Sequence, residues 1–132
     1  MKPIVYLATV TDQYRHPEYP AFRHAVRVRF PAELYELVEP AHQNWSLEAW
    51  HAAWREILPS LHTLVVWPRP DFVIGRGVFS EIRDCQERAV PILILPEPSS
   101  WYLDFRVELT GAGPYRHWAR IQPLGDGADG TT

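Results

Sequence analysis

The chain has 132 residues, of which 46% are hydrophobic and 22% charged, with a formal net charge of −3. This length and composition predict one globular domain that buries its own core. The negative charge gives no basic surface for a nucleic-acid polymer, and no apolar run approaches the ~20 residues of a membrane helix, so we expect neither partner.

The first predicted strand covers residues 3–10, where PIVYLATV is apolar and rich in β-branched side chains. It has no signal-peptide pattern, and the single cysteine, Cys85, can form no internal disulfide, which together favour the cytoplasm. Residues 11–20 are polar with two prolines and predict a loop at the carboxyl end of this strand. Its ligand-contact candidates, against the alternative of a solvated loop, are Asp12, Gln13, Tyr14 and Arg15.

The next two segments each fit both a helix and a strand. Residues 21–30 carry a helical apolar stripe, although their VRVRF stretch alternates like a strand. An α/β fold expects a helix there, and we choose the helix. Residues 33–39 follow helical spacing, while the same fold needs its second strand near residues 34–40, and PAHQNW at 40–45 is a loop.

The clearest helix covers residues 46–61. Ser46 is a good N-cap, Glu48 favours the positive end of the helix, and Pro59 should end it. Tryptophans one turn apart are more typical of a core or a subunit interface than of a cofactor platform. Its apolar stripe consists of Leu47, Trp50, Trp54, Ile57, Leu58 and Leu61.

The stretch that organises the chain is residues 71–96, which follow a strand at 62–67. It predicts a loop with two glycines, a short helix with Glu81 in its first turn, and a strand within 90–95. The apolar face of the helix, which includes Cys85 as a core residue, is Val78, Ile82, Cys85 and Ala89. The apolar run after it is typical of a parallel sheet covered on both faces. Ligands of such sheets bind beyond the carboxyl ends of the strands, which is where the loop at Gly75–Gly77 lies.

The C-terminal part begins with a loop at 96–101. Residues 102–110 fit an extended arm or a helix, 111–114 a turn, and 117–124 a last strand. Residues 125–132 are Gly-rich and polar and predict a flexible tail. The alternation of strands and helices along the chain argues for a parallel sheet covered by helices.

Three segments resemble the nucleoside 2-deoxyribosyltransferase-like superfamily: IVYLA at 4–8, GRGVFSEI at 75–82 and AVPILIL at 89–95. The superfamily signature is a Tyr on the first strand, a Gly-containing loop, and a Glu that opens a helix. The resemblance implies a single-domain α/β, flavodoxin-like (Rossmann-like) three-layer sandwich over residues 1–124, with a parallel sheet of four or five strands. It also implies a homodimer or higher homo-oligomer, for which the Trp-rich helix 46–58 is a candidate interface.

This superfamily includes transferases and nucleoside or nucleotide N-glycoside hydrolases, so the resemblance also assigns roles. Glu81 matches the nucleophile that attacks the anomeric carbon, and Tyr6 matches the residue that orients it. The helix N-terminus should help to keep Glu81 ionised. The segment Gly75, Arg76 and Gly77 would cradle a sugar or a 5′-phosphate, with Asp12 and Asp71 as further substrate contacts. Without the resemblance, these residues fit an ordinary helix start and a plain turn.

The sequence departs from the family at two positions. The Asp that precedes the family Glu by six residues is Gly75 here, and Arg55 or Glu56 stands near the place of a sugar-binding Asp. Our leading hypothesis is hydrolysis or transfer at the N-glycosidic bond of a small nucleoside or nucleoside 5′-monophosphate. The alternative is a non-catalytic nucleotide-binding or partner-docking module with the same fold, and a third is a flavodoxin-like protein of unrelated purpose. The six histidines show no metal-site spacing, and we expect no metal and no cofactor.

Overall fold

The computed structural model describes residues 2–9, 13–40, 43, 45–69, 72–95, 101–109 and 115–123, and beyond Leu103 it describes only the backbone, apart from Ile121. The expected Asp12, Asp71, turn 111–114 and tail 125–132 lie outside these residues. In chain order the elements are β1 (Ile4–Thr9), α1 (Tyr19–Arg29), β2 (Glu36–Val38), α2 (Leu47–Ile57), η3 (Leu58–Ser60), β3 (Leu61–Trp67), β4 (Val73–Gly75), α3 (Arg76–Glu87), β5 (Ile92–Ile94), β6 (Trp101–Leu109) and β7 (Tyr115–Pro123).

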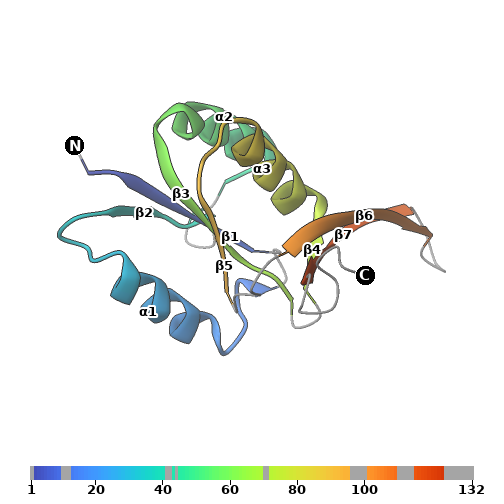
Figure 1. Ribbon diagram of the computed structural model, residues 1–132, viewed down its shortest axis with the longest axis horizontal. Coiled ribbons are helices and arrows are strands. Elements are labelled where there is room, and N and C mark those ends of the chain that lie inside the picture. Colours follow the sequence, from blue (N-terminus) through green and yellow to red (C-terminus); the bar gives the residue numbers. More distant parts are fainter. Residues whose placement is uncertain are drawn as a thin grey trace, which may run out of the picture.

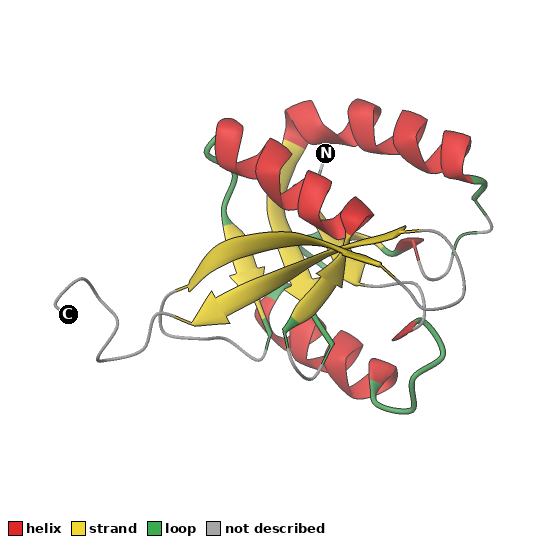
Figure 2. Cartoon of the chain, turned by 90° about the vertical axis from the view of Figure 1, so that its right-hand side faces the viewer, coloured by secondary structure: helices red, strands yellow, loops and turns green. Residues whose placement is uncertain are grey.

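The main sheet has four parallel strands in the order β2-β1-β3-β5. Helix α1 covers one face of this sheet, and α2 and α3 cover the other (Figure 1, Figure 2). This is the expected three-layer α/β arrangement, so the predicted fold class is confirmed. No helix among the described residues is both long enough and apolar enough to cross a bilayer.

Each strand of the main sheet contributes to two cores because successive side chains point to opposite faces. On one face Val5, Val65 and Leu93 pack against α1 through Phe22 and Val26. The opposite face of the sheet packs against α2 and α3. Its core includes Tyr6, Ala8, Leu64, Val66 and Ile94 from the strands and Trp54, Val78, Ile82 and Cys85 from the helices. Burial on both faces explains why these strands read as unbroken apolar runs.

A second, antiparallel sheet of three strands has the order β4-β7-β6. The last predicted strand exists as β7, but it pairs outside the parallel sheet. The segment 102–110, which fits an extended arm or a helix by sequence, is extended and forms β6. Strands β6 and β7 together project from the body of the protein (Figure 1). Residues 67–77, which we expect to form a loop after the third strand, are not a continuous loop, because β4 interrupts them and pairs with β7.

The helix chosen for residues 21–30 is confirmed as α1, and the strand alternative at 33–39 is realised as β2. Helix α2 begins after Ser46, whose Oγ accepts a hydrogen bond of 3.1 Å from the backbone N–H of Ala49. Pro59 lies in the 3₁₀ turn that follows the helix, as its missing N–H predicts.

Helix α3 begins earlier than its sequence pattern indicates. It starts at Arg76, so Gly75 ends β4 and is the N-cap, and Gly77 lies inside the first helical turn. The expected two-glycine loop is therefore wrong, and Glu81 lies in the second turn instead of the first. The helix ends at Glu87, which leaves Ala89 exposed with a positive φ of 57° and not on the apolar face.

Candidate functional site

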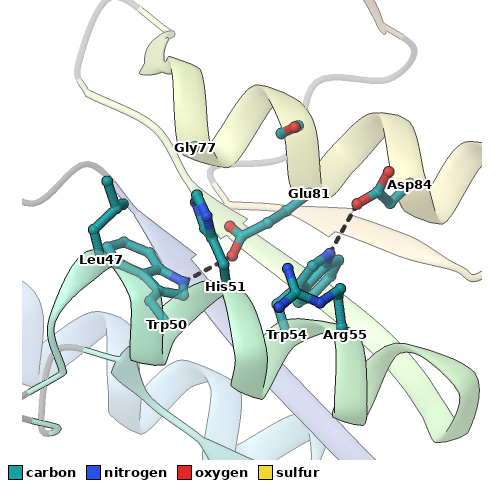
Figure 3. A pocket seen from close by; sticks show the side chains of 9 residues that line it. Leu47, Trp50, His51, Trp54, Arg55, Gly77, Glu81 and Asp84 are labelled. Atoms are coloured by element: carbon teal, nitrogen blue, oxygen red, sulfur yellow. Dashed lines mark hydrogen bonds between the residues drawn. The ribbon is translucent and has the colours of Figure 1, made fainter.

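A cavity of about 320 Å³ lies between α2 and α3, and Glu81 reaches into it from α3 (Figure 3). The described residues that line it all come from these two helices: Leu47, Trp50, His51, Trp54, Arg55, Gly77, Ser80, Glu81 and Asp84. The two helices run in the same direction, since Trp50 faces Glu81 and, further along, Trp54 faces Asp84 (Figure 3).

Two indoles of α2 each hold one carboxylate of α3. Trp50 Nε1–H donates to Glu81 Oε2 over 3.2 Å and also to the Tyr6 hydroxyl over 2.7 Å. Trp54 Nε1–H donates to Asp84 Oδ2 over 2.9 Å. Residues three or four apart share a helix face, so both pairs point into the same interhelical space. Trp54 is a core residue, as expected, whereas Trp50 is only half-buried. Both form part of the wall of the cavity.

The Glu81 side chain is buried, with 4% of the residue exposed. Burial raises the pKa of Glu81 to about 7. Hydrogen bonds with Tyr6 and Trp50 lower this pKa and partly offset the effect of burial, whereas the negative charge of Asp84 raises it further. The expectation that the helix N-terminus keeps Glu81 ionised is wrong, because Glu81 lies beyond the first turn and burial dominates. Its second oxygen, Oε1, is buried and has no hydrogen-bond partner among the residues that the structure describes.

Tyr6 lies directly beside this carboxylate. It is fully buried on β1, and its ring packs edge-on against Trp54 with centroids 4.9 Å apart. Burial, and then the charge of Glu81 and a hydrogen bond with it, raise the pKa of Tyr6 far above its usual value. The phenol therefore stays protonated and can donate to the carboxylate, so the structure brings the predicted pair Tyr6 and Glu81 together.

The loop after β1 carries three described ligand candidates, Gln13, Tyr14 and Arg15, which differ in burial. Gln13, one of the ligand candidates, is instead a structural anchor: its Nε2 donates to Thr9 Oγ1 over 2.9 Å and to the Trp67 carbonyl over 3.2 Å. The Tyr14 hydroxyl is buried and has no hydrogen-bond partner in the described part of the chain. Burial, followed by the charge of Glu81, raises the pKa of Tyr14 to about 12. Arg15 is exposed.

The three residues of the predicted cradle separate in the structure. Gly77 lines the cavity, while Gly75 and the exposed Arg76 are not among its described lining residues. A Cβ on either glycine would meet nothing within 4 Å, so neither is required by close packing. At Gly77 that open space belongs to the cavity.

Sequence reasoning missed Asp84, His51 and Ser80 as lining residues. The available signal for Asp84 was its position three residues after Glu81, which places both carboxylates on one helix face. Cys85 is buried, and burial raises the pKa of its thiol to about 12, in keeping with a core residue. Among the described residues no group of three His, Cys, Asp or Glu side chains could hold a metal ion.

At the level of sequence, neither a protein-family model nor a curated protein matches the chain. Among solved structures, a 2-desoxiribosyltransferase from Leishmania mexicana matches with a TM-score of 0.50 and 12% identity. The match covers 70% of this chain and 63% of that one, so this chain spans less than two thirds of that protein. The chain has a nucleoside 2-deoxyribosyltransferase-like fold. The resemblance noted in the sequence is thus confirmed as a resemblance of fold.

In this nucleoside 2-deoxyribosyltransferase-like fold, the buried carboxylate lies over the face of the sheet that α2 and α3 cover. Tyr6 on β1 reaches it from the sheet, and Trp50 reaches it from α2. Three elements that are distant in sequence therefore fix the position of one carboxylate.

Proposed function

We propose that this protein cleaves the N-glycosidic bond of a nucleoside or nucleoside 5′-monophosphate, with Glu81 as the nucleophile. The observation that carries this proposal is the buried Oε1 of Glu81, which has no partner although Glu81 lines a cavity. The 2-deoxyribosyltransferase-like fold supports the same chemistry.

In the first step an oxygen of Glu81 forms a bond to the anomeric carbon. The C1′–N bond breaks, and its electron pair leaves with the base. Trp50 donates to Oε2, which leaves Oε1 with its lone pairs unused. Tyr6 is the positioning residue, because its buried phenol hydrogen-bonds the carboxylate.

In the second step the sugar passes from Glu81 to an acceptor, and Asp84 removes the acceptor's proton. The acceptor atom bonds to C1′, and the electron pair of the ester bond returns to Glu81. Residues three apart share a helix face, so Asp84 lies on the same side of α3 as Glu81 and lines the same cavity. Water as acceptor makes the protein a hydrolase, and a second base makes it a transferase.

The side chains that line the cavity have the chemical character that a nucleoside site needs. Trp50, Trp54 and Leu47 give apolar surface for a base or a sugar face, and the exposed Arg55 offers a cation that suits a 5′-phosphate. Leu47 is 68% exposed at the edge of the cavity, which supports the predicted homo-oligomer in which a second copy covers this edge.

A second candidate is a nucleotide-binding module without turnover. It is favoured by Gly75, which stands where the family has an Asp. It is also favoured by the pKa of Glu81, since a value of about 7 leaves about half of the carboxyl groups protonated at neutral pH. Such a module would bind nucleotides and release no base.

The test is base release from a panel of ribo- and deoxyribonucleosides and their 5′-monophosphates, followed by chromatography. Glu81→Gln keeps the shape of the side chain and removes the nucleophile, and Glu87→Gln, exposed on the same helix, is the matched control. We expect release by the wild type and Glu87→Gln and none by Glu81→Gln. Ligand-induced thermal stabilisation without any release would instead support the binding module.

A further inference from the structure

Two buried side-chain oxygens in the described part of the chain have no hydrogen-bond partner: the Tyr14 hydroxyl and Glu81 Oε1. Buried polar groups are nearly always hydrogen-bonded, because leaving one unpaired loses the bonds that it made to water. Each of these atoms therefore calls for a partner from outside the described residues.

Both atoms belong to one cluster. The charge of Glu81 acts on the Tyr14 phenol, and Tyr14 in turn acts on Tyr6, which contacts Glu81 and Trp50. The position of Tyr14 is fixed by its neighbour Gln13, whose amide is bonded to the carboxyl ends of β1 and β3. The fold thus places the unpaired phenol and the unpaired carboxylate oxygen in one electrostatically coupled cluster.

The two groups define the chemistry of the missing partner. A protonated phenol can donate a hydrogen bond, and a carboxylate can only accept one. A partner that lies between them must accept from Tyr14 and donate to Glu81. A hydroxyl group does both, whereas an ammonium group only donates and a carbonyl oxygen only accepts.

We infer that Tyr14 and Glu81 Oε1 form a hydroxyl-binding subsite beside the nucleophile, which takes either a sugar hydroxyl or a water molecule. This inference rests on the proposed function for its substrate. In retaining glycosidases the hydroxyl next to the anomeric carbon makes hydrogen bonds that strengthen in the transition state. For a nucleoside that group is the ribose 2′-hydroxyl, so the subsite favours ribonucleosides over 2′-deoxyribonucleosides.

The test is Tyr14→Phe, which removes the hydroxyl and keeps the ring, with Tyr102→Phe at a half-exposed position as control. Two measurements are made: the Tm of the ligand-free protein, and kcat/KM for a ribonucleoside and the 2′-deoxyribonucleoside of the same base.

If the subsite binds the sugar, Tyr14→Phe keeps or raises the ligand-free Tm, because an unpaired hydroxyl is gone. The ratio of ribo to deoxy kcat/KM then falls about tenfold, the loss of one hydrogen bond. If the subsite holds water, the Tm falls and the two substrates are affected equally. An unchanged or higher Tm together with unchanged kinetics for both substrates would overturn the inference.

The inference and the proposed function can fail separately. If the wild type releases no base, thermal shift with the same two nucleosides replaces the kinetics. A larger shift with the ribonucleoside that Tyr14→Phe abolishes would keep the subsite and remove the catalytic proposal. Equal shifts in wild type and Tyr14→Phe, with a ligand-free Tm that is not lowered, would remove the subsite.

Discussion

Trp50 and Glu81 are joined across two helices by a hydrogen bond of 3.2 Å from the indole Nε1 to Oε2. The same indole N–H lies 2.7 Å from the Tyr6 hydroxyl, so one donor connects α2, the central strand β1 and the carboxylate on α3. This contact holds one oxygen of Glu81, while the other, Oε1, has no partner among the described residues.

The pH dependence of catalysis follows from the burial of Glu81. A nucleophilic carboxylate must be ionised, and burial raises the pKa of Glu81 to about 7. We expect kcat/KM to rise with pH through about 7 and then to level off. The measurement is base release across pH 5 to 9 at low substrate concentration. A rate that falls through pH 7 would mean that Glu81 acts as an acid, against the nucleophile assignment.

Trp50→Phe should move this profile. The hydrogen bond from Trp50 lowers the pKa of Glu81, so its removal raises that pKa and shifts the rising limb to higher pH. The phenyl ring keeps most of the apolar wall, and we expect a several-fold loss of rate at pH 7 that shrinks at pH 9. A loss of the same size at every pH would indicate that the indole serves only as a wall.

Glu81 also makes the stability of the protein depend on pH. The folded pKa is raised from 4.5 to about 7, so the folded state binds this proton more tightly than the unfolded state does. Its contribution is fully present below about pH 4.5 and is lost as pH rises through about 7, on the order of 3 kcal/mol. We expect the free energy of unfolding of Glu81→Gln, measured in denaturant, to lack this fall. Parallel curves for Glu81→Gln and wild type would contradict the raised pKa.

The elements that organise this fold were readable from local pattern. Ser46 and Pro59 mark the ends of a helix through a side-chain cap and a missing N–H, and both act within a few residues of the chain. The antiparallel sheet was not readable, since β4 has only three residues and forms its ladder with β7, far along the chain. A local sequence pattern does not indicate which distant segment a short strand will pair with.

The site was predictable only in part, and for the same reason. The pairing of Tyr6 with Glu81 followed from the family resemblance, but the raised pKa of Glu81 depends on burial under a neighbouring helix. In the sequence, Asp84 cannot be distinguished from other polar residues of a surface helix. Its position in the cavity becomes evident only from its hydrogen bond with the Trp54 indole on α2.

Asp84→Asn tests the second carboxylate. Asparagine can still accept the hydrogen bond from Trp54 through its side-chain oxygen, but it cannot take a proton from the acceptor. We expect a rapid burst of base release followed by a turnover at least about 100-fold slower, the usual size of general-base catalysis. Azide, a nucleophile that gives up no proton, should restore turnover. Slow turnover without a burst and without azide rescue would assign Asp84 a purely structural role.

The central claim is a covalent bond between the sugar and Glu81. Its most direct test is the intact mass of Asp84→Asn protein that has been quenched with acid during turnover, followed by peptide mapping. The account predicts one added pentosyl group, or its 5′-phosphate, on the peptide that contains Glu81, and no addition in the double variant with Glu81→Gln. Base release by the wild type that persists in Glu81→Gln, with no adduct on any peptide, would contradict it.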